Sequence, residues 1–553
     1  MGKEIQTEDK SILNAAVSRR HVLAGVGAGA AASVAVAQGA YAASSSAPIL
    51  QTGHGPVRGQ RQAGVSVFKG IRYGADTAPT RFEKPQAPRA WTSVKEAFEY
   101  GGACPQRREN KSESEDCLFL NVWTPASAKG DNLADGGNRP IMVYFHGGAY
   151  NNGSGSSPLY DGQYLANKGD VVVITVNHRL NAFGYLYLPL LMGGAFPDSG
   201  NAGIWDLVLA LKWVKNNARN FGGDPDRVMV FGQSGGGAKI ATMMAAPAAK
   251  GLFHSAATMS GQQVTASGPL NATQRAEAYL EALSIAPGDV EAIKAVPFQK
   301  MVELLTTPDP VNTTRGLYFG PVLDERFLMR HPFWPDAPAQ SANIPMLLGN
   351  THDETRTLVG RREPESFSLE WEDLPPRLSR HLRCDILPQH VVDTYRKTYP
   401  DYSASDVFFA AVTAGRSWRG QWEEAEVRAK QAEVMETAPT WVYQMDFGSP
   451  IDDGKWGASH AFDIPLAFGN IDKQGSRTGI SRTAVRVADE LSWAMINLAT
   501  HGDPNHDGLA PWKPYSLEHR ETMVFDEHTK LISDPRGAER RLFSKVPFTQ
   551  WGT

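Results

Sequence analysis

The chain has 553 residues, of which 42% are hydrophobic and 21% charged, with a formal net charge of −4. At roughly 100–200 residues per domain this length allows three to four domains or one large α/β domain, and such a chain can bury a core without metals or disulfides. The nearly balanced charge argues against binding to nucleic acid or to an anionic membrane, and the mean hydropathy of −0.33 excludes a polytopic membrane protein.

One long uncharged apolar stretch lies near the N-terminus. Ser18-Arg19-Arg20 precedes an Ala/Gly/Val run from Val22 to Ala40, which ends at Ala40-Tyr41-Ala42. Paired arginines, a weakly apolar run and an Ala-x-Ala site are typical of a bacterial twin-arginine signal. The run is long enough to span a membrane, so a retained anchor helix is the alternative, but its glycines and the cleavage site favour removal. We predict a signal peptide at 1–42 and an exported chain at 43–553, periplasmic or secreted, without stable membrane insertion.

The exported chain carries three cysteines, Cys104, Cys117 and Cys384. An oxidising compartment permits one pair and leaves one thiol over. A bridge between Cys104 and Cys117 would close a short polar loop and contribute roughly 3 kcal/mol in the chain-entropy model. Three free thiols are the alternative at this point.

Short apolar runs alternate with helical patterns along the chain. Strands are predicted at Ile141–Phe145, Val171–Val176, Val228–Phe231, Pro345–Leu348 and Thr440–Phe447, and helices at Ile204–Val214 and Ala238–Ala246. The first runs are apolar or β-branched throughout, as in strands buried on both faces. This alternation predicts a mostly parallel sheet, in one catalytic domain with large, mainly helical insertions between Ser267 and Glu436.

The sharpest local motif is Gly232-Gln233-Ser234-Gly235-Gly236. Its Gly-x-Ser-x-Gly pattern is expected by chance about 0.3 times in such a chain, so the pattern alone is weak evidence for a nucleophile and the flanking segments have to support it. The predicted strand Val228–Phe231 runs into it and a small-residue helix leaves it, which is the layout of a nucleophile elbow. We therefore predict Ser234 as a nucleophile.

A second motif supplies possible oxyanion donors. The predicted strand Ile141–Phe145 ends in His146-Gly147-Gly148-Ala149-Tyr150, whose small residues let backbone N–H groups approach a substrate. A serine nucleophile needs a base, an acid that orients the base, and donors aimed at the developing oxyanion. The two motifs together fit an acyl-transfer site.

Further short motifs follow one another along the chain from about residue 50 to 545. They are Phe68-Lys69-Gly70-Ile71, Arg81-Phe82, Ser114–Val122, Asn177–Gly184, Phe221–Pro225, Gly502–Asn505 and Trp512. Together with the two motifs they resemble the type-B carboxylesterase and cholinesterase family. The resemblance implies the α/β-hydrolase fold, a mostly parallel central sheet flanked by helices with large helical insertions, and a triad without a cofactor.

The resemblance also assigns the other site residues. Gly349–Glu354 is similar to the family's acid loop and Gly457–Asp463 to its histidine loop, which implies Glu354 as the acid and His460 as the base. The order Ser, Glu, His is that of α/β-hydrolases, with Asp353 as the alternative acid.

Other roles follow from the same resemblance. The oxyanion N–H groups are expected from Gly148, Ala149 and Gly235, a hydrogen bond to the acid from Ser260, and the disulfide between Cys104 and Cys117.

Two features depart from the family pattern. Gln233 stands before the nucleophile where the family often has glutamate, and the short loop between Cys104 and Cys117 holds no aromatic residue, whereas cholinesterases carry a tryptophan in a longer loop. The cholinesterase subtype is therefore not expected. Asp463 near His460 could suggest a metal site, but no further ligand cluster accompanies them, so no metal is predicted.

These observations predict a carboxylic-ester hydrolase acting on small neutral esters. The alternatives are an amidase or carbamate hydrolase with the same triad and a non-catalytic, neuroligin-like binding protein. Candidate pocket aromatics are Phe319, Trp334, Phe408, Phe409, Trp418 and Trp422. The sequence makes no prediction of oligomeric state.

Overall fold

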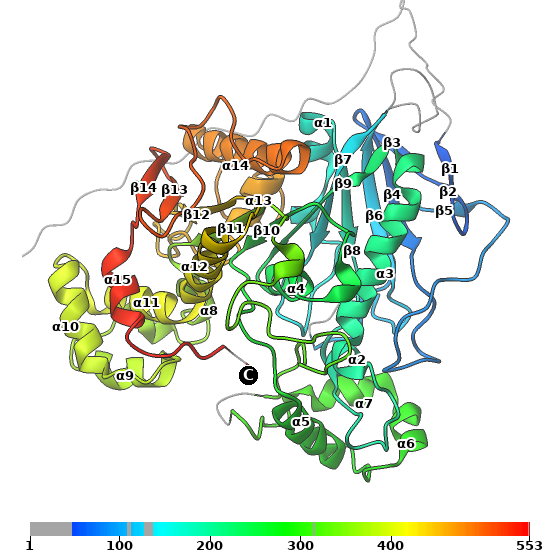
Figure 1. Cartoon of the computed structure of the whole chain (residues 1–553), viewed down its shortest axis with the longest axis horizontal. Helices are drawn as coiled ribbons and strands as arrows, with labels where there is room; N and C mark the ends of the chain where they lie inside the picture. Colours follow the sequence, from blue (N-terminus) through cyan, green and yellow to red (C-terminus); the bar gives the residue numbers. More distant parts are fainter. Residues whose placement is uncertain (1–46, 108–111, 127–136, 313–315, 551, 553) are drawn as a thin grey trace, which may run out of the picture. The chain divides into compact units, whose positions relative to one another are not determined.

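The chain folds around one large twisted β-sheet (Figure 1). The computed structural model describes residues 47–107, 112–126, 137–312, 316–550 and 552. In this part of the chain the sheet has 11 strands, in the order β14-β13-β12-β11-β10-β9-β7-β8-β6-β4-β3. The strands are β3 (Gln60–Gln62), β4 (Val65–Arg72), β6 (Phe119–Pro125), β7 (Arg139–Phe145), β8 (Val172–Val176), β9 (Gly223–Gln233), β10 (Ser255–Met259), β11 (Met346–Thr351), β12 (Thr440–Met445), β13 (Glu521–Phe525) and β14 (Lys530–Ser533).

The central strands of the sheet, from β8 through β7 and β9 to β13, are parallel to one another. The outer strands β6, β4, β3 and β14 pair antiparallel. A separate small sheet holds β1 (Ile49–Thr52), β2 (Gly55–Arg58) and β5 (Lys95–Glu96). The predicted mostly parallel sheet is confirmed.

Helices connect the strands and cover the sheet (Figure 1). They are α1 (Gln163–Gly169), α2 (Asn181–Tyr185), α3 (Ala202–Asn217), α4 (Gly235–Met244), α5 (Pro269–Ala282), α6 (Val290–Ala295), α7 (Phe298–Glu303), α8 (Glu354–Leu358), α9 (Leu374–His381), α10 (Pro388–Thr398), α11 (Ala404–Thr413), α12 (Arg419–Val434), α13 (Asp463–Phe468), α14 (Arg482–His501) and α15 (Gly537–Phe543). Between α11 and α12 the chain makes one π-helical segment, Ala414–Trp418.

The two faces of the sheet pack into two separate cores. In β7, Ile141 and Val143 join one core with side chains of α3 and α4. Met142 and Tyr144, which point to the other face, join a second core with side chains of α1, α13 and α14. Because successive side chains of a strand point to opposite faces, burial of both faces explains the unbroken apolar run of this strand.

A third core lies within the predicted insertion. Side chains of α9, α10 and α11 pack together there, with Leu542 and Phe543 of α15 against them. Figure 1 shows these helices grouped on one side of the sheet's carboxyl ends. The insertion is thus helical, as predicted, and it has its own apolar centre.

Residues from separate segments of the sequence form buried ion pairs. Arg81 donates from Nε to Glu115 Oε2 at 2.7 Å, and both side chains are nearly buried. Arg179 donates to Asp206 of α3 at 2.7 Å, with at most 2% of either side chain exposed. A buried charge is tolerated only when it is paired, so these segments constrain one another although they are distant in sequence.

The predicted Cys104–Cys117 disulfide is not present in the structure, where both thiols are free and buried. The Leu180 N–H donates to Cys104 Sγ at 3.2 Å. A hydrogen bond with Cys104 and burial together raise the pKa of the Cys117 thiol well above its usual value. Because the thiolate is the species that reacts in thiol–disulfide exchange, the raised pKa makes the Cys117 thiol a poor nucleophile.

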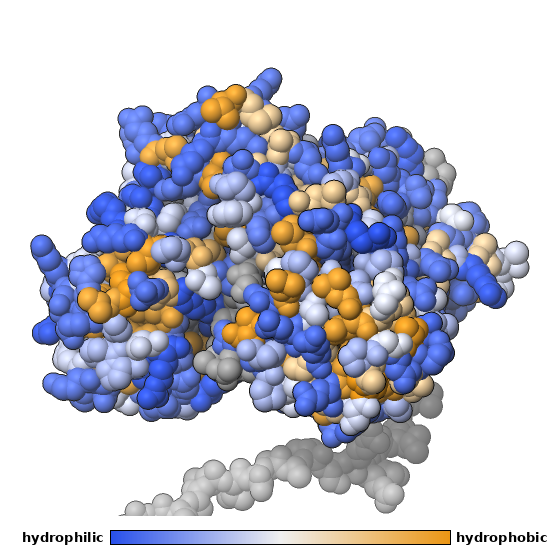
Figure 2. Space-filling model, turned by 60° about the horizontal axis from the view of Figure 1, so that its bottom comes forward, coloured by the Kyte–Doolittle hydropathy of each residue, from blue (hydrophilic) through white to orange (hydrophobic). Residues whose placement is uncertain are grey.

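The predicted signal peptide, residues 1–42, lies outside the described residues. Among the described helices, none combines the length and the apolar character needed to cross a bilayer. Figure 2 shows hydrophilic residues over most of one face of the molecule, with hydrophobic residues in separate patches.

Candidate active site

Ser234 occupies the sharp turn between β9 and α4. Its backbone has φ 57° and ψ −125°, and its N–H donates to the carbonyl oxygen of Met259 at 2.7 Å. A serine at positive φ is strained and persists only where its surroundings hold it. A Cβ on Gly236 would lie 1.9 Å from the carbonyl oxygen of Phe145, so only glycine fits there. The turn has the geometry of the predicted nucleophile elbow.

His460 lies directly beside Ser234. Its Nε2 is 2.8 Å from Ser234 Oγ, and its Nδ1 makes a short hydrogen bond to Glu354 Oε2. An ionised carboxylate only accepts hydrogen bonds, so Nδ1 carries the proton and Nε2 accepts from the serine hydroxyl. The structure therefore brings the three residues predicted as a triad into one hydrogen-bonded chain.

Glu354 is fully buried at the start of α8. Its Oε1 accepts from Asn350 Nδ2 at 3.2 Å and from the Thr351 N–H at 3.1 Å. Burial alone would raise the pKa of this carboxyl, but His460, the adjacent Ser260 and the Thr351 N–H together hold the pKa below its usual value. Glu354 is thus kept as a carboxylate that faces the imidazole.

The predicted contact of Ser260 with the acid is present only in a loose form. Its hydroxyl helps to lower the pKa of Glu354, but among the described residues it has no hydrogen-bond partner of standard geometry.

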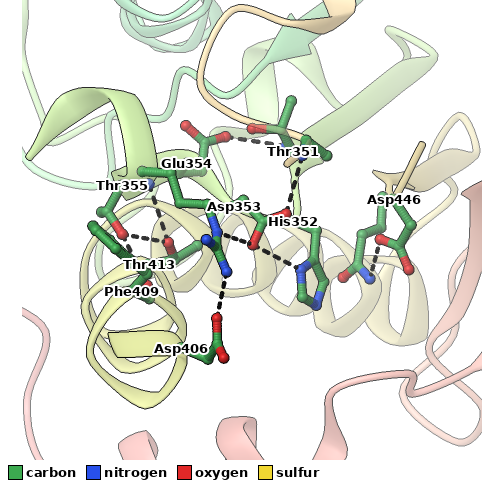
Figure 3. Close-up of polar contacts among 12 residues, drawn as sticks. Thr351, His352, Asp353, Glu354, Thr355, Asp406, Phe409, Thr413 and Asp446 are labelled. Atoms are coloured by element: carbon green, nitrogen blue, oxygen red, sulfur yellow. Dashed lines mark hydrogen bonds and ion pairs between the residues drawn. The ribbon is translucent and has the colours of Figure 1, made fainter. Parts of the chain in front are cut away.

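Asp353, the alternative acid, faces away from the imidazole. Figure 3 shows its carboxylate directed towards His352, while Glu354 lies against Thr351. Asp353 accepts from Arg356 Nε at 3.2 Å and from the Ala458 N–H at 3.0 Å. Asp353 therefore ties down the loop that carries His460, and Glu354 is the carboxylate in contact with the ring.

The predicted oxyanion loop is held against the start of α4. Gly148 and Ala149 have φ angles of 91° and 53°. A Cβ on Gly235 would lie only 2.0 Å from the carbonyl oxygen of Ala149. None of the N–H groups of these three residues donates to another group in the part of the chain that the structure describes. Three unused donors near a nucleophile are what an oxyanion site requires.

We expect Gly235→Ala to lower kcat by roughly 10²-fold or more, because the added Cβ must displace the Ala149 backbone and with it the donors. Steady-state kinetics on a p-nitrophenyl ester measures this, and Gly268→Ala is the control, since a Cβ there meets open space and its backbone φ of −69° suits alanine. Wild-type kcat in folded Gly235→Ala would show that the loop tolerates the shift.

Gln233 also reaches the imidazole, with its Nε2 at 3.3 Å from His460 Nε2. The residue before the nucleophile is thus a neutral amide in contact with the base. Asp463 instead accepts from the Tyr443 hydroxyl at 2.8 Å, and burial together with the nearby Glu354 raises its pKa to about 6. Within the described ranges no group of three His, Cys, Asp or Glu side chains is placed to hold a metal ion.

Most of the candidate pocket aromatics belong to the cores. Buried side chains are those of Phe319, Phe408, Phe409, Trp418 and Trp422, and Trp334 is 57% exposed. Aromatic residues in a helical insertion are thus mainly packing groups here, as their periodic spacing also allows.

The site includes one side chain that the motifs did not single out. Lys239 lies in α4 with no exposed surface, and its Nζ donates to the Ala149 carbonyl oxygen at 2.9 Å. The sequence feature that could have identified it is a lone lysine in a predicted helix of small and apolar residues, five positions after the nucleophile.

Comparisons with known proteins identify the family of this chain. Residues 46–543 match the carboxylesterase family. The para-nitrobenzyl esterase of Bacillus subtilis is 33% identical over 89% of this chain and 98% of its own length. Phenmedipham hydrolase of Pseudarthrobacter oxydans is 30% identical over 88% of this chain and 97% of its own. The solved structure of a Geobacillus stearothermophilus carboxylesterase has a TM-score of 0.79 at 33% identity and covers 90% of this chain and 100% of that one. The chain therefore belongs to the carboxylesterase family and is a hydrolase with the α/β-hydrolase fold.

Proposed function

We propose that this carboxylesterase hydrolyses neutral organic esters through a covalent acyl-enzyme on Ser234. Ser234 Oγ attacks the ester carbonyl carbon while His460 Nε2 takes its proton, and Glu354 stabilises the resulting imidazolium. The N–H groups of Gly148 and Ala149, with that of Gly235, bind the oxyanion. Collapse breaks the bond to the alcohol, which leaves with the proton from His460.

Deacylation repeats these steps with water. His460 takes a proton from water, the hydroxide attacks the acyl carbon, and the second tetrahedral intermediate releases the carboxylic acid as Ser234 Oγ regains its proton. The observation that carries this proposal is the continuous hydrogen-bonded chain from Ser234 through His460 to Glu354. A non-catalytic binding protein has no need for such an alignment.

The acyl-enzyme is tested by stopping the reaction with a p-nitrophenyl ester within milliseconds and mapping tryptic peptides by mass spectrometry. We expect the acyl mass on the peptide that contains Ser234, and a burst of p-nitrophenol when deacylation is slower than acylation. An acyl group on a different residue, or a phosphonate ester that inhibits without modifying Ser234, would contradict the mechanism.

A neutral ester is expected to have a higher kcat/KM than its choline analogue of similar size and leaving-group reactivity. A quaternary ammonium needs aromatic faces or a carboxylate to replace its hydration. Gln233 is neutral, and the segment 105–116 contains no aromatic residue. Trp418 already has the Arg536 guanidinium 4.6 Å from its ring centroid. Since a desolvated cation–π contact is worth about 2 kcal/mol, its absence should cost the choline ester roughly 30-fold.

This comparison requires paired assays of butyrylcholine and 3,3-dimethylbutyl butyrate, which have the same shape and differ in charge. Equal or faster turnover of the choline ester would mean that another part of the site binds the cation. Gln233→Glu tests whether the missing carboxylate is the cause, because a carboxylate at this position should reduce the difference in kcat/KM between the neutral ester and the choline ester.

Export through a twin-arginine signal is a proposal from the sequence alone. It is tested by N-terminal sequencing of protein recovered from the producing cell's exported fraction, where a start near Ala43 is expected.

A further inference from the structure

Lys239 is a buried amine without a carboxylate partner. It has no exposed surface, and no ion pair of Lys239 with a described carboxylate is formed, since its contacts are two carbonyl oxygens and one aromatic ring. Burial alone lowers its pKa to about 7. A fully buried lysine is expensive unless it is paired, so this position calls for an explanation.

The contacts of Lys239 all lie on the oxyanion loop. Nζ donates to the carbonyl oxygen of Ala149 at 2.9 Å and to that of His146 at 3.2 Å, and it lies 5.4 Å from the centroid of the Tyr150 ring. The two carbonyls flank the segment 147–149, so one side chain holds both ends of the loop.

The loop needs such a restraint. Ala149 has φ 53°, a conformation that costs a residue with a Cβ of the order of 1 kcal/mol or more and that reverts unless its surroundings hold it. The Ala149 carbonyl oxygen that Lys239 binds is also the nearest atom to the position that a Cβ on Gly235 would occupy. Because Gly235 and Lys239 are four residues apart, they lie on the same side of α4, and both contact the loop from that side.

We propose that Lys239 is a positioning residue of the oxyanion site: its Nζ donates hydrogen bonds to the carbonyl oxygens of His146 and Ala149 and thereby fixes the N–H groups of Gly148 and Ala149 relative to that of Gly235. This inference rests on the proposed acyl-enzyme mechanism, and it assigns Lys239 no contact with substrate. Transition-state stabilisation by preorganised donors is sensitive to displacements of an ångström, so loss of the clamp should affect kcat more than substrate binding.

The test compares the wild type with Lys239→Met, whose unbranched side chain is one atom shorter than that of lysine and has no donors. On a p-nitrophenyl ester we expect kcat to fall roughly 10- to 100-fold with KM within about threefold. A trifluoromethyl ketone, which adds Ser234 to form an oxyanion, should bind more weakly by a similar factor. The corresponding methyl ketone, which stays mainly unreacted, should bind as before.

Ile240→Val is the matched control, because it alters the next buried residue of α4, whose side chain has no polar atom to bind the loop carbonyls. Neither kcat nor the affinity for either ketone should change. Lys239→Gln keeps N–H donors one atom nearer the backbone and should lose less activity than Lys239→Met. If Lys239→Met does not fold, Lys239→Gln provides the test. The proposal then requires the affinity for the trifluoromethyl ketone to fall relative to that for the methyl ketone.

The proposal is overturned if a folded Lys239 variant keeps wild-type kcat and trifluoromethyl ketone affinity, or if both ketones weaken equally, which would mark a merely structural role. Ser234→Ala in the same assays separates this failure from that of the mechanism. If that variant turns over ester normally, the acyl-enzyme proposal fails. If it is inactive while Lys239→Met is fully active, only the role of Lys239 fails.

Discussion

Replacing Ser234 by alanine is expected to lower kcat by roughly 10⁴–10⁶-fold while the fold remains intact. The loss is large because the serine, the imidazole and the carboxylate act as one unit, so removal of the nucleophile ends the covalent route. The alanine variant loses the hydrogen bond between Ser234 Oγ and His460 and keeps the backbone turn, whose φ is 57°. Steady-state kinetics and thermal unfolding of the same preparation measure both effects.

A fluorophosphonate probe provides the control for this variant. It should label the wild type and the folded Asp353→Asn variant, and it should leave Ser234→Ala unlabelled. Turnover by Ser234→Ala within a factor of ten of the wild type would refute the nucleophile, provided that the preparation is free of wild-type enzyme.

Glu354→Gln is expected to lower kcat by roughly 10⁴-fold, because the amide presents donors to His460 Nδ1 and permits the wrong tautomer of the ring. The change is nearly isosteric, and Asn350 and the Thr351 N–H can still bond to the amide oxygen. The matched variant is Asp353→Asn, which removes the neighbouring carboxylate that does not touch the ring. We expect a loss of about tenfold or less from it.

The main effect of Asp353→Asn should be on stability. Burial opposes ionisation of Asp353, but His352, Arg356 and the Ala458 N–H together hold its pKa below the usual value. A carboxyl with a depressed pKa stabilises the folded state above its unfolded pKa and loses that contribution as the pH falls. Asp353→Asn should therefore lower the free energy of unfolding at pH 7, with the difference shrinking below about pH 4. Greater loss of kcat in Asp353→Asn than in Glu354→Gln would reassign the acid.

The parallel strands β7, β8, β9, β11 and β12 were predictable because local sequence determined them, whereas the parallel strands β10 and β13 were not predicted. The run Ile141–Phe145 has no polar residue, and its burial on both faces in β7 is what that pattern requires. The edge strands β3 and β14 were not predicted, since short edge strands with exposed side chains carry little hydrophobic pattern. The predicted helix Ile204–Val214 proved longer, Ala202–Asn217, because polar residues at helix ends break the periodicity before the helix stops.

The sequence by itself determined the elbow at Ser234 and the loop that follows β7, because small residues next to buried strands specify sharp turns locally. The family and the acid loop after β11 came from the resemblance of the ordered motifs. Only the tertiary structure decided between Glu354 and Asp353, since adjacent residues point in different directions and their partners come from distant loops. It also showed that Cys104 and Cys117 are both buried, and it revealed the contact of Lys239 with the oxyanion loop. These features depend on distances between side chains that are remote in sequence. Burial matters because hydrogen bonds and charge interactions are stronger in the low-dielectric interior.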